Sequence, residues 1–79
     1  MVHENVERIR EAKGVTKTHL AKRLDVSLQG YRHIASGNVR LDVERLRLIA
    51  KELGVEVAVF FDDKLTDSVI KELVGNSVT

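Results

Sequence analysis

The segment TKTHLAKRLDVSLQGYRHIAS, residues 16–36, has the spacing of two short helices joined by a tight turn. In the first helix Leu20, Ala21 and Leu24 fall at i, i+1 and i+4, so they share one face, which we expect to be the inner one. Asp25 follows where the chain must reverse, and aspartate tolerates a left-handed backbone better than most residues do. The segment is therefore predicted to fold as helix, turn and helix.

The second helix is expected from Leu28 to Ala35, with the Ser27 hydroxyl capping its first amides. Its inner face holds Tyr31 and Ile34. The outer faces carry Leu28, Gln29, Arg32, His33 and Ser36. A short helix that is packed on one side and polar on the other is typical of helices that enter the major groove of DNA.

A longer pattern surrounds these two helices. It consists of Gly14, Val15, Thr16, Lys17, Leu20, Ala21, Asp25, Val26, Ser27, Tyr31, Ile34 and Gly37, then Leu46, Ile49, Ala50, Leu53, Gly54 and Val55. In this spacing the chain from Gly14 to Phe61 resembles the helix-turn-helix domain of Cro and the phage repressors, also called the XRE family. The resemblance implies an all-α fold with a five-helix DNA-binding domain in residues 1–61. Residues 62–79 lie beyond this domain, and their own spacing predicts an additional C-terminal amphipathic helix.

Composition agrees with one small domain. The 79 residues are 43% hydrophobic and 4% aromatic and include no proline, which predicts a single aliphatic, helical core. No cysteine is available for disulfides or thiolate metal sites, and no apolar run approaches the length of a membrane span. The N-terminus has no signal-peptide core, so we expect a soluble, cytoplasmic protein with no membrane partner.

The net charge of +1 is unevenly distributed. Residues 1–40 carry eight basic and four acidic side chains, whereas residues 41–79 carry five basic and eight acidic ones. The basic half contains the two-helix segment, which favours double-stranded DNA as the partner.

Three further helices are expected. The first runs from about His3 to Ala12 and stops before Gly14, and another runs from a cap at Asp42 to Gly54. A last helix, capped by Thr66 or Asp67, has an apolar stripe. This stripe consists of Val69, Ile70, Leu73 and Val74.

The run VEVAVFF, residues 55–61, allows two interpretations. Its alternating valines favour a strand, whereas Val57, Phe60 and Phe61 also fit one face of a short helix. The family places a short helix here, and we adopt that prediction. An amphipathic helix added to a finished core needs cover for its stripe. We therefore predict a homodimer interface made of Val57, Phe60, Phe61, Val69, Ile70, Leu73 and Val74.

The expected DNA contacts divide by chemistry. Base edges are assigned to Gln29, whose amide matches adenine, and to Arg32, which matches guanine. Leu28 suits a thymine methyl group, and His33 suits either a base or the backbone. Phosphate contacts are assigned to Thr16, Lys17, Ser27, Asn38 and Arg40.

The chain departs from the family pattern near Arg10. Many members pair this arginine with a glutamate late in the recognition helix, where this chain has Ala35. That link is predicted to be missing. Tyr31 is assigned to the core, with the alternative that its hydroxyl emerges at a phosphate.

The predicted function is a sequence-specific transcriptional regulator, a repressor of the phage or mobile-element type, which binds a palindromic operator as a dimer. The alternative is a protein-interaction module, such as an antitoxin or anti-regulator, that binds a partner protein. His3, His19 and His33 are too scattered for a metal site, and no nucleophile is paired with a base, so we expect neither a cofactor nor an enzyme.

Overall fold

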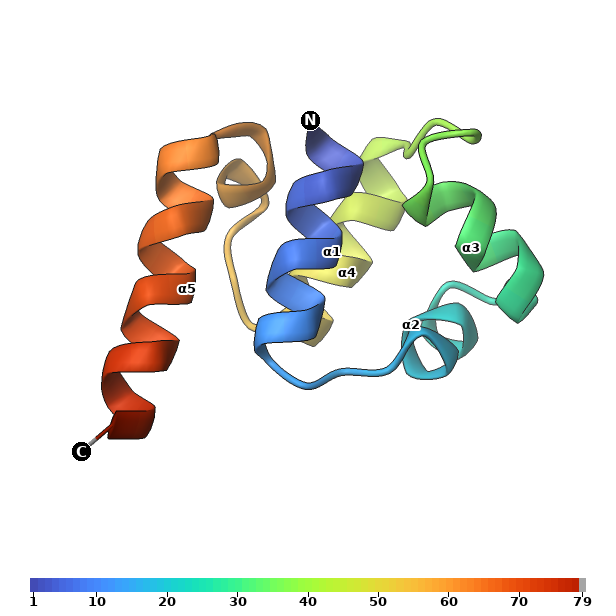
Figure 1. Ribbon diagram of the computed structural model, residues 1–79. Helices are drawn as coiled ribbons and strands as arrows, with labels where there is room; N and C mark the ends of the chain where they lie inside the picture. Colours follow the sequence, from blue (N-terminus) through green and yellow to red (C-terminus); the bar gives the residue numbers. More distant parts are fainter. Residues whose placement is uncertain (79) are drawn as a thin grey trace.

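A computed structural model describes residues 1–78 as a helical domain without strands in that range. Its elements are α1 (Val2–Ala12), α2 (Lys17–Arg23), α3 (Leu28–Ala35), α4 (Val43–Leu53), the 3₁₀ helix η1 (Val57–Phe61) and α5 (Asp63–Val78). The all-α prediction is confirmed, with η1 as the fifth helix of the core and α5 as the added one (Figure 1).

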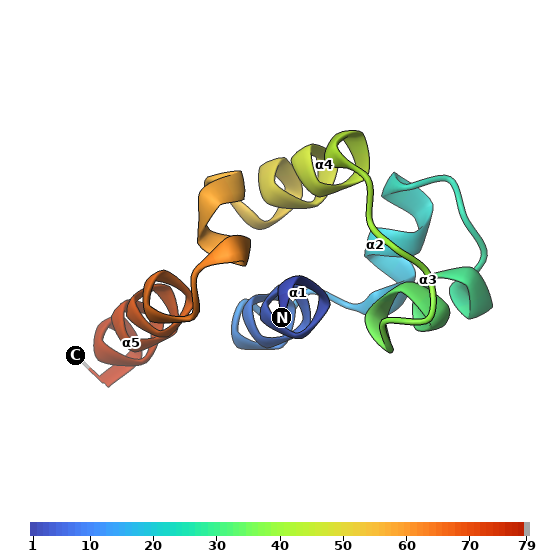
Figure 2. The same ribbon diagram turned by 90° about the horizontal axis from the view of Figure 1, so that it is seen from above.

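The core lies between α1, α2, α3, α4 and η1. Its buried apolar residues are Val6, Ile9, Leu20, Ala21, Leu24, Tyr31, Ile34, Leu46, Ile49, Ala50, Leu53 and Phe60. These are the inner positions that the helical spacing predicts, because side chains three and four residues apart share a helix face. Seen from above, α1 lies between α5 on one side and the α2–α3 pair on the other (Figure 2).

The segment with two possible periods forms a short helix. Within η1, Phe60 is 0% exposed and joins the core, whereas Phe61 is 62% exposed. The prediction of a short helix is confirmed, and the strand interpretation is wrong. Val57 and Val59 are partly buried against the core, so the alternating valines reflect packing on a one-turn helix.

The start of α5 differs from the prediction. Asp62 caps the helix, because its Oδ1 accepts hydrogen bonds from the amides of Lys64 at 2.8 Å and Leu65 at 3.1 Å. Thr66 lies one turn inside the helix, fully buried, and its hydroxyl donates to the Val59 carbonyl at 2.7 Å. Thr66 therefore docks the helix instead of capping it.

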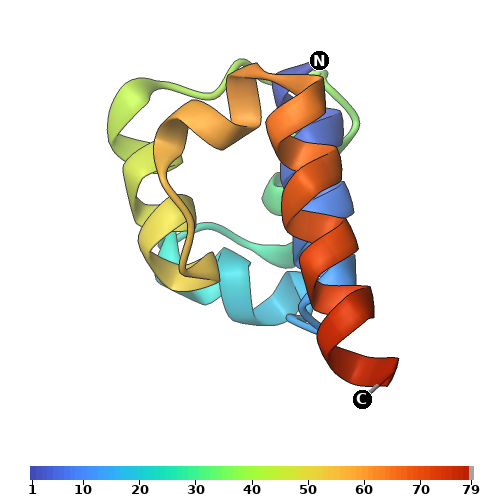
Figure 3. The ribbon, with the colours of Figure 1, turned by 90° about the vertical axis from the view of Figure 1, so that its left-hand side faces the viewer.

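Helix α5 packs on its own chain, against α1 and η1. Helices α1 and α5 run side by side in the same direction (Figures 1 and 3). Buried Asn5 donates from Nδ2 to the Phe60 carbonyl at 3.0 Å and to Asp63 Oδ1 at 2.9 Å. Arg8 and Asp67 form an ion pair farther along the same two helices.

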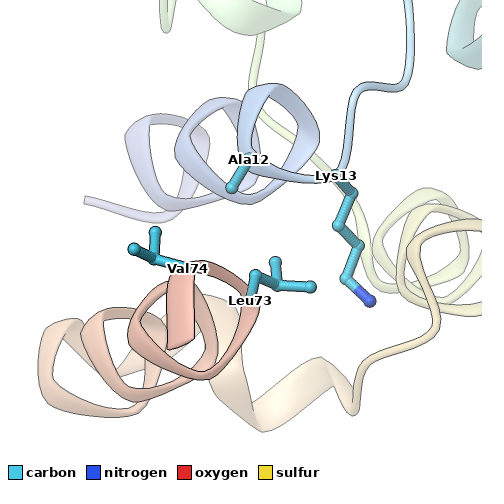
Figure 4. A pocket seen from close by; sticks show the side chains of 4 residues that line it. All are labelled: Ala12, Lys13, Leu73 and Val74. Carbon is cyan, nitrogen blue, oxygen red and sulfur yellow. The ribbon is translucent and has the colours of Figure 1, made fainter. Parts of the chain in front are cut away.

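This docking covers much of the apolar stripe of α5. Val69, Ile70 and Leu73 are half-buried, and at the far end Leu73 and Val74 line a pocket with Ala12 and Lys13 at the end of α1 (Figure 4). Val74 keeps 57% of its surface exposed. The stripe is therefore covered in large part within one chain, which weakens the reason for assigning it to a dimer.

Candidate nucleic-acid interface

The turn between α2 and α3 has the backbone that the sequence predicts. Asp25 adopts φ 56°, in the left-handed region, and the Val26 amide returns to the Ala21 carbonyl at 3.0 Å. Ser27 then caps α3, because its Oγ accepts from the Gly30 amide at 2.9 Å. Since the turn and the cap are both closed by local hydrogen bonds, α3 starts at a defined angle to α2.

One face of α3 is polar and exposed. Gln29, Arg32 and His33 are all exposed and stand at i, i+3 and i+4, so they share a single side of the helix. Tyr31 and Ile34 occupy the opposite side and are buried. Helix α3 packs only against α1 and α2 within residues 1–78, and it forms the end of the molecule opposite α5 (Figure 1). Leu28 is half-buried at the first position of the helix.

The residues predicted to contact phosphates lie at three places around this face. Thr16 is exposed at the start of α2, where its Oγ1 accepts from the His19 amide at 3.0 Å, and half-buried Lys17 follows it. Ser27 is exposed at the start of α3. Asn38 and Arg40 are exposed on the loop that leaves the other end of α3.

Helix α3 is tied to α1 by a buried polar network that the sequence did not reveal. Glu7 accepts hydrogen bonds from Arg10 Nε at 2.8 Å and from Arg10 Nη2 at 3.1 Å. The Tyr31 hydroxyl donates to the same carboxylate at 2.7 Å, and Arg10 Nη1 donates to the Val15 carbonyl at 2.7 Å. The link that many family members make from this arginine to the end of α3 is missing, as predicted, because Ala35 has no side-chain acceptor. Glu7 and Tyr31 connect α1 and α3 instead.

This network corrects the alternative role of Tyr31. The ring is fully buried and the hydroxyl is bonded to Glu7, so it does not emerge at a phosphate. Burial and the neighbouring carboxylate raise the pKa of Tyr31, which keeps the hydroxyl protonated as a donor. Burial also raises the pKa of Glu7, but hydrogen bonds from Arg10 and Tyr31 and the charges of Arg10 and Lys17 outweigh it and leave the pKa lowered.

A second polar contact joins α2 to α4. Glu52 receives a hydrogen bond from Arg23 Nε at 2.9 Å, and His19 Nε2 lies 2.5 Å from its other oxygen. The bond with His19 and the charge of Arg23 lower the pKa of Glu52. Both ends of the two-helix segment are thus fastened, α3 through Tyr31 and α2 through Glu52.

Residues 1–78 contain neither a metal-ligand cluster nor a membrane-spanning helix. No group of three or more His, Cys, Asp or Glu side chains there is placed to hold a metal ion. No helix of that range is both long and apolar enough to cross a bilayer.

Comparison with known families gives one match: the model of a family described as helix-turn-helix matches residues 6–60. The chain belongs to the helix-turn-helix family of the Cro and phage-repressor type. This family consists of DNA-binding domains and not of enzymes. No significant match was found among curated proteins or solved structures. The matched residues end inside η1, and α5 lies outside the match.

The residues predicted for a dimer are not all accessible. Phe60 is completely buried in its own chain, which corrects its assignment to an interface. Val57, Val69, Ile70 and Leu73 are half-buried. Of the predicted set, Phe61 and Val74 are the two exposed members.

The structural roles of three residues were not predicted from the sequence. Asn5 interrupts the apolar stripe of α1 between Val2 and Val6, and a polar residue at an inner helix position signals a specific buried hydrogen bond. Glu7 stands three residues before Arg10, which is a spacing for an ion pair on one helix. For Thr66, assumed to be a cap, the sequence offered no signal of burial.

Proposed function

We propose that this chain is a sequence-specific transcriptional regulator that binds double-stranded DNA, with α3 in the major groove, and that it represses genes of a phage or mobile element. The exposed face formed by Gln29, Arg32 and His33 carries the proposal. A helix surface that only faces solvent can carry any polar residues. On α3, however, the Gln29 amide and the Arg32 guanidinium, which are groups that pair with base edges, lie on the one face that the core leaves exposed.

Each side chain has a role in this proposal. Gln29, in the first turn, donates to and accepts from an adenine edge, and Arg32, one turn later, donates to guanine O6 and N7. Leu28 packs on a thymine methyl group, and His33 contacts a base or the neighbouring backbone. The phosphate contacts come from Thr16, Lys17, Ser27, Asn38 and Arg40, and they set the register of α3 without selecting sequence.

Alanine at Gln29 or Arg32 is expected to weaken binding to the best site by about 1–3 kcal/mol and to relax preference at one base position, because each side chain pairs with one base. The measurement is a titration of the parent and each variant against the best site and its single-base variants. Uniform weakening on every sequence would show that these two side chains touch only the backbone.

Alanine at Lys17 or Arg40 is expected to weaken binding equally on all sequences and to reduce the slope of log K against log salt by about 1, since one phosphate contact is lost. Lys71→Ala is the matched control, because exposed Lys71 lies on α5, at the end of the molecule opposite α3. A salt slope that changes with Lys71 and not with Lys17 or Arg40 would contradict the assignment.

The operator is proposed to be palindromic and occupied by two copies, since one domain of this size makes few base contacts and a second half-site multiplies affinity. Selection of bound sequences from random duplex DNA tests the function as a whole. Enrichment of an inverted repeat is expected. Failure to enrich any motif would refute sequence-specific binding and favour a partner protein as the target of the exposed α3 face.

A further inference from the structure

The loop that joins α3 to α4 is fastened at its two ends. At the α3 end, the amides of Asn38 and Val39 donate to the His33 carbonyl at 3.0 and 3.3 Å. At the α4 end, Leu41 is half-buried against the core. Between these points the Arg40 amide donates no hydrogen bond to any group that the structure describes. The middle of the loop therefore depends on packing for its position.

Two of the proposed phosphate contacts stand on this loop. The side chains of Asn38 and Arg40 are exposed, and neither makes a hydrogen bond or an ion pair in the described part of the chain. Both groups are therefore available to DNA. Because hydrogen bonds weaken beyond about 3.2 Å, the position of the loop decides whether these two side chains reach a phosphate oxygen.

His3, in the first turn of α1, lies against the loop at Gly37. A Cβ added to Gly37 would lie 2.7 Å from both Cε1 and Nε2 of the imidazole and 3.2 Å from Nδ1. Carbon atoms in contact normally stay about 3.5–4.0 Å apart. The His3 ring thus fills the space that a larger residue at Gly37 would need. The amino-terminal end of α1 and the loop lie together at the top of the molecule in Figure 1.

Helix α1 gives the His3 ring a fixed base. Two positions along, buried Asn5 is hydrogen-bonded to η1 and to α5, and Val6 and Ile9 lie in the core. The His3 side chain is itself half-buried, and it makes no hydrogen bond or ion pair with any described residue. Its effect on the loop is therefore one of shape, exerted from an element that cannot easily move.

We propose that His3 is a positioning residue for DNA binding, whose ring supports the α3–α4 loop at the place from which Asn38 and Arg40 reach the phosphates. This inference rests on the proposed function, and it adds a residue that does not itself contact DNA. Without the ring, the loop moves into the space beside Gly37, and the Arg40 guanidinium leaves its phosphate.

Replacement of His3 tests this support. His3→Ala is expected to weaken binding of the full chain to its best site roughly tenfold, because a hydrogen bond from Arg40 to a charged phosphate is lost. His3→Phe keeps a flat ring beside Gly37 and is expected to bind as the parent does. Equal weakening by alanine and phenylalanine would mean that the imidazole itself acts on DNA, which would overturn the positioning role.

The salt dependence of binding identifies the contact that is lost. His3→Ala is expected to reduce the slope of log K against log salt by about 1, as Arg40→Ala does, since both remove the same phosphate contact. Adding Arg40→Ala to His3→Ala is then expected to leave the slope of His3→Ala unchanged. Parental affinity and slope in His3→Ala would overturn the proposal, and so would a further fall of about 1 in the double variant.

Val2→Ala is the matched control for a change at the start of α1. Val2 is also half-buried and packs against the core, but the three atoms nearest to a Cβ at Gly37 all belong to His3. Val2→Ala is expected to match the parent in affinity and salt slope, under conditions where circular dichroism shows every variant to be folded. A loss equal to that of His3→Ala would assign the effect to general loosening of α1 and contradict the role of the ring.

A second measurement introduces the missing Cβ. Gly37→Ala and Gly54→Ala both place alanine in left-handed backbone, at φ +83° and +69°, but the neighbour at Gly54 is the flexible Lys13 ammonium at 3.6 Å. Gly37→Ala is expected to weaken DNA binding more than Gly54→Ala, because its Cβ pushes the loop off the His3 ring. In the His3→Ala chain this space is open, so Gly37→Ala is expected to add at most about a twofold loss. The same loss in both backgrounds would mean that backbone strain alone is responsible, which would overturn the contact.

Failure of the proposed function and failure of the His3 role give different results. If the parent enriches no sequence from random duplex DNA, the proposed function is refuted and the role of His3 with it. If the parent enriches a motif and His3→Ala binds that motif with parental affinity and salt slope, the proposed function stands and only the role of His3 is refuted.

Discussion

Replacing Phe60 with alanine is expected to lower the free energy of unfolding by about 3–5 kcal/mol, whereas Phe61→Ala changes it by about 0.5 kcal/mol or less. The two neighbours share one 3₁₀ helix, but Phe60 is 0% exposed and Phe61 is 62% exposed. Removing the Phe60 ring leaves a cavity beneath η1, where the core, α1 and α5 meet. For Phe61 only surface contact is lost.

Urea unfolding of the full chain, followed by circular dichroism at low protein concentration, measures both changes. If Phe60→Ala does not fold, Phe60→Leu supplies a measurable value, because it retains most of the apolar volume and is expected to cost about 1.5 kcal/mol or less. Similar losses for Phe60→Ala and Phe61→Ala would mean that η1 does not turn Phe60 into the core and Phe61 toward solvent.

The two helices around Asp25 could be predicted from the sequence because local rules determine them. Apolar spacing selects the inner faces, Ser27 supplies an acceptor for an orphan amide, and Asp25 tolerates the left-handed turn. All of these depend on residues within a few positions of each other. The exposed face of Gln29 and Arg32 follows directly, since it is the side that the inner residues do not use.

Other features depend on contacts between distant segments, and the sequence does not specify these. The stripe of α5 requires a cover, but periodicity does not say whether α1 or a second copy provides it. In the structure α1 provides the cover. Asn5 of α1 fixes this arrangement by donating hydrogen bonds to Phe60 and Asp63, which lie 55 and 58 positions away in the sequence. The predicted start of α5 was wrong because it also depends on a contact between separate segments. Threonine is a common capping residue, but here Thr66 is buried and its hydroxyl donates to the Val59 carbonyl.

Residues 55–61 illustrate a third case, in which two local rules conflict. β-branched alternation favours a strand, but a strand here would need a neighbouring strand to pair with, and residues 1–78 contain none. The 3₁₀ helix finds hydrogen-bond partners without a second strand, because Val59 N–H donates to the Glu56 carbonyl and the Phe60 and Val59 carbonyls accept from Asn5 and Thr66, and it still buries Phe60. The requirement for hydrogen-bond partners therefore outweighs the local preference.

Replacing Glu7 with alanine is expected to cost about 3 kcal/mol of unfolding free energy, at the lower end of the range for breaking a buried ion pair. The side chains of Arg10 and Glu7 are only 9% and 17% exposed, so the guanidinium would lose its main partner away from water. The bond from Arg10 to the Val15 carbonyl remains, which moderates the loss. Tyr31→Phe removes one hydrogen bond and is expected to cost less, about 1.5 kcal/mol.

The same carboxylate makes stability depend on pH. The pKa of Glu7 is lower in the folded chain than the ordinary glutamate value of 4.5. A lowered folded-state pKa means that the unfolded chain binds the proton more tightly, so the contribution of Glu7 is complete above 4.5 and is lost as pH falls through the lowered value. Glu7→Gln, which cannot ionise, is expected to unfold with less dependence on pH in this acid range.

Urea unfolding of the parent and of Glu7→Gln, near neutral pH and at about pH 3.5, measures how much unfolding free energy each chain loses between the two pH values. The parent is expected to lose more. Because Tyr31 lies on α3, weakening the network should also loosen the helix that carries Gln29 and Arg32. Tyr31→Phe is therefore expected to bind DNA less tightly than the parent, under conditions where both are fully folded, although Tyr31 itself is buried away from the exposed face. Unchanged affinity together with the expected loss of stability would limit the network to a role in folding.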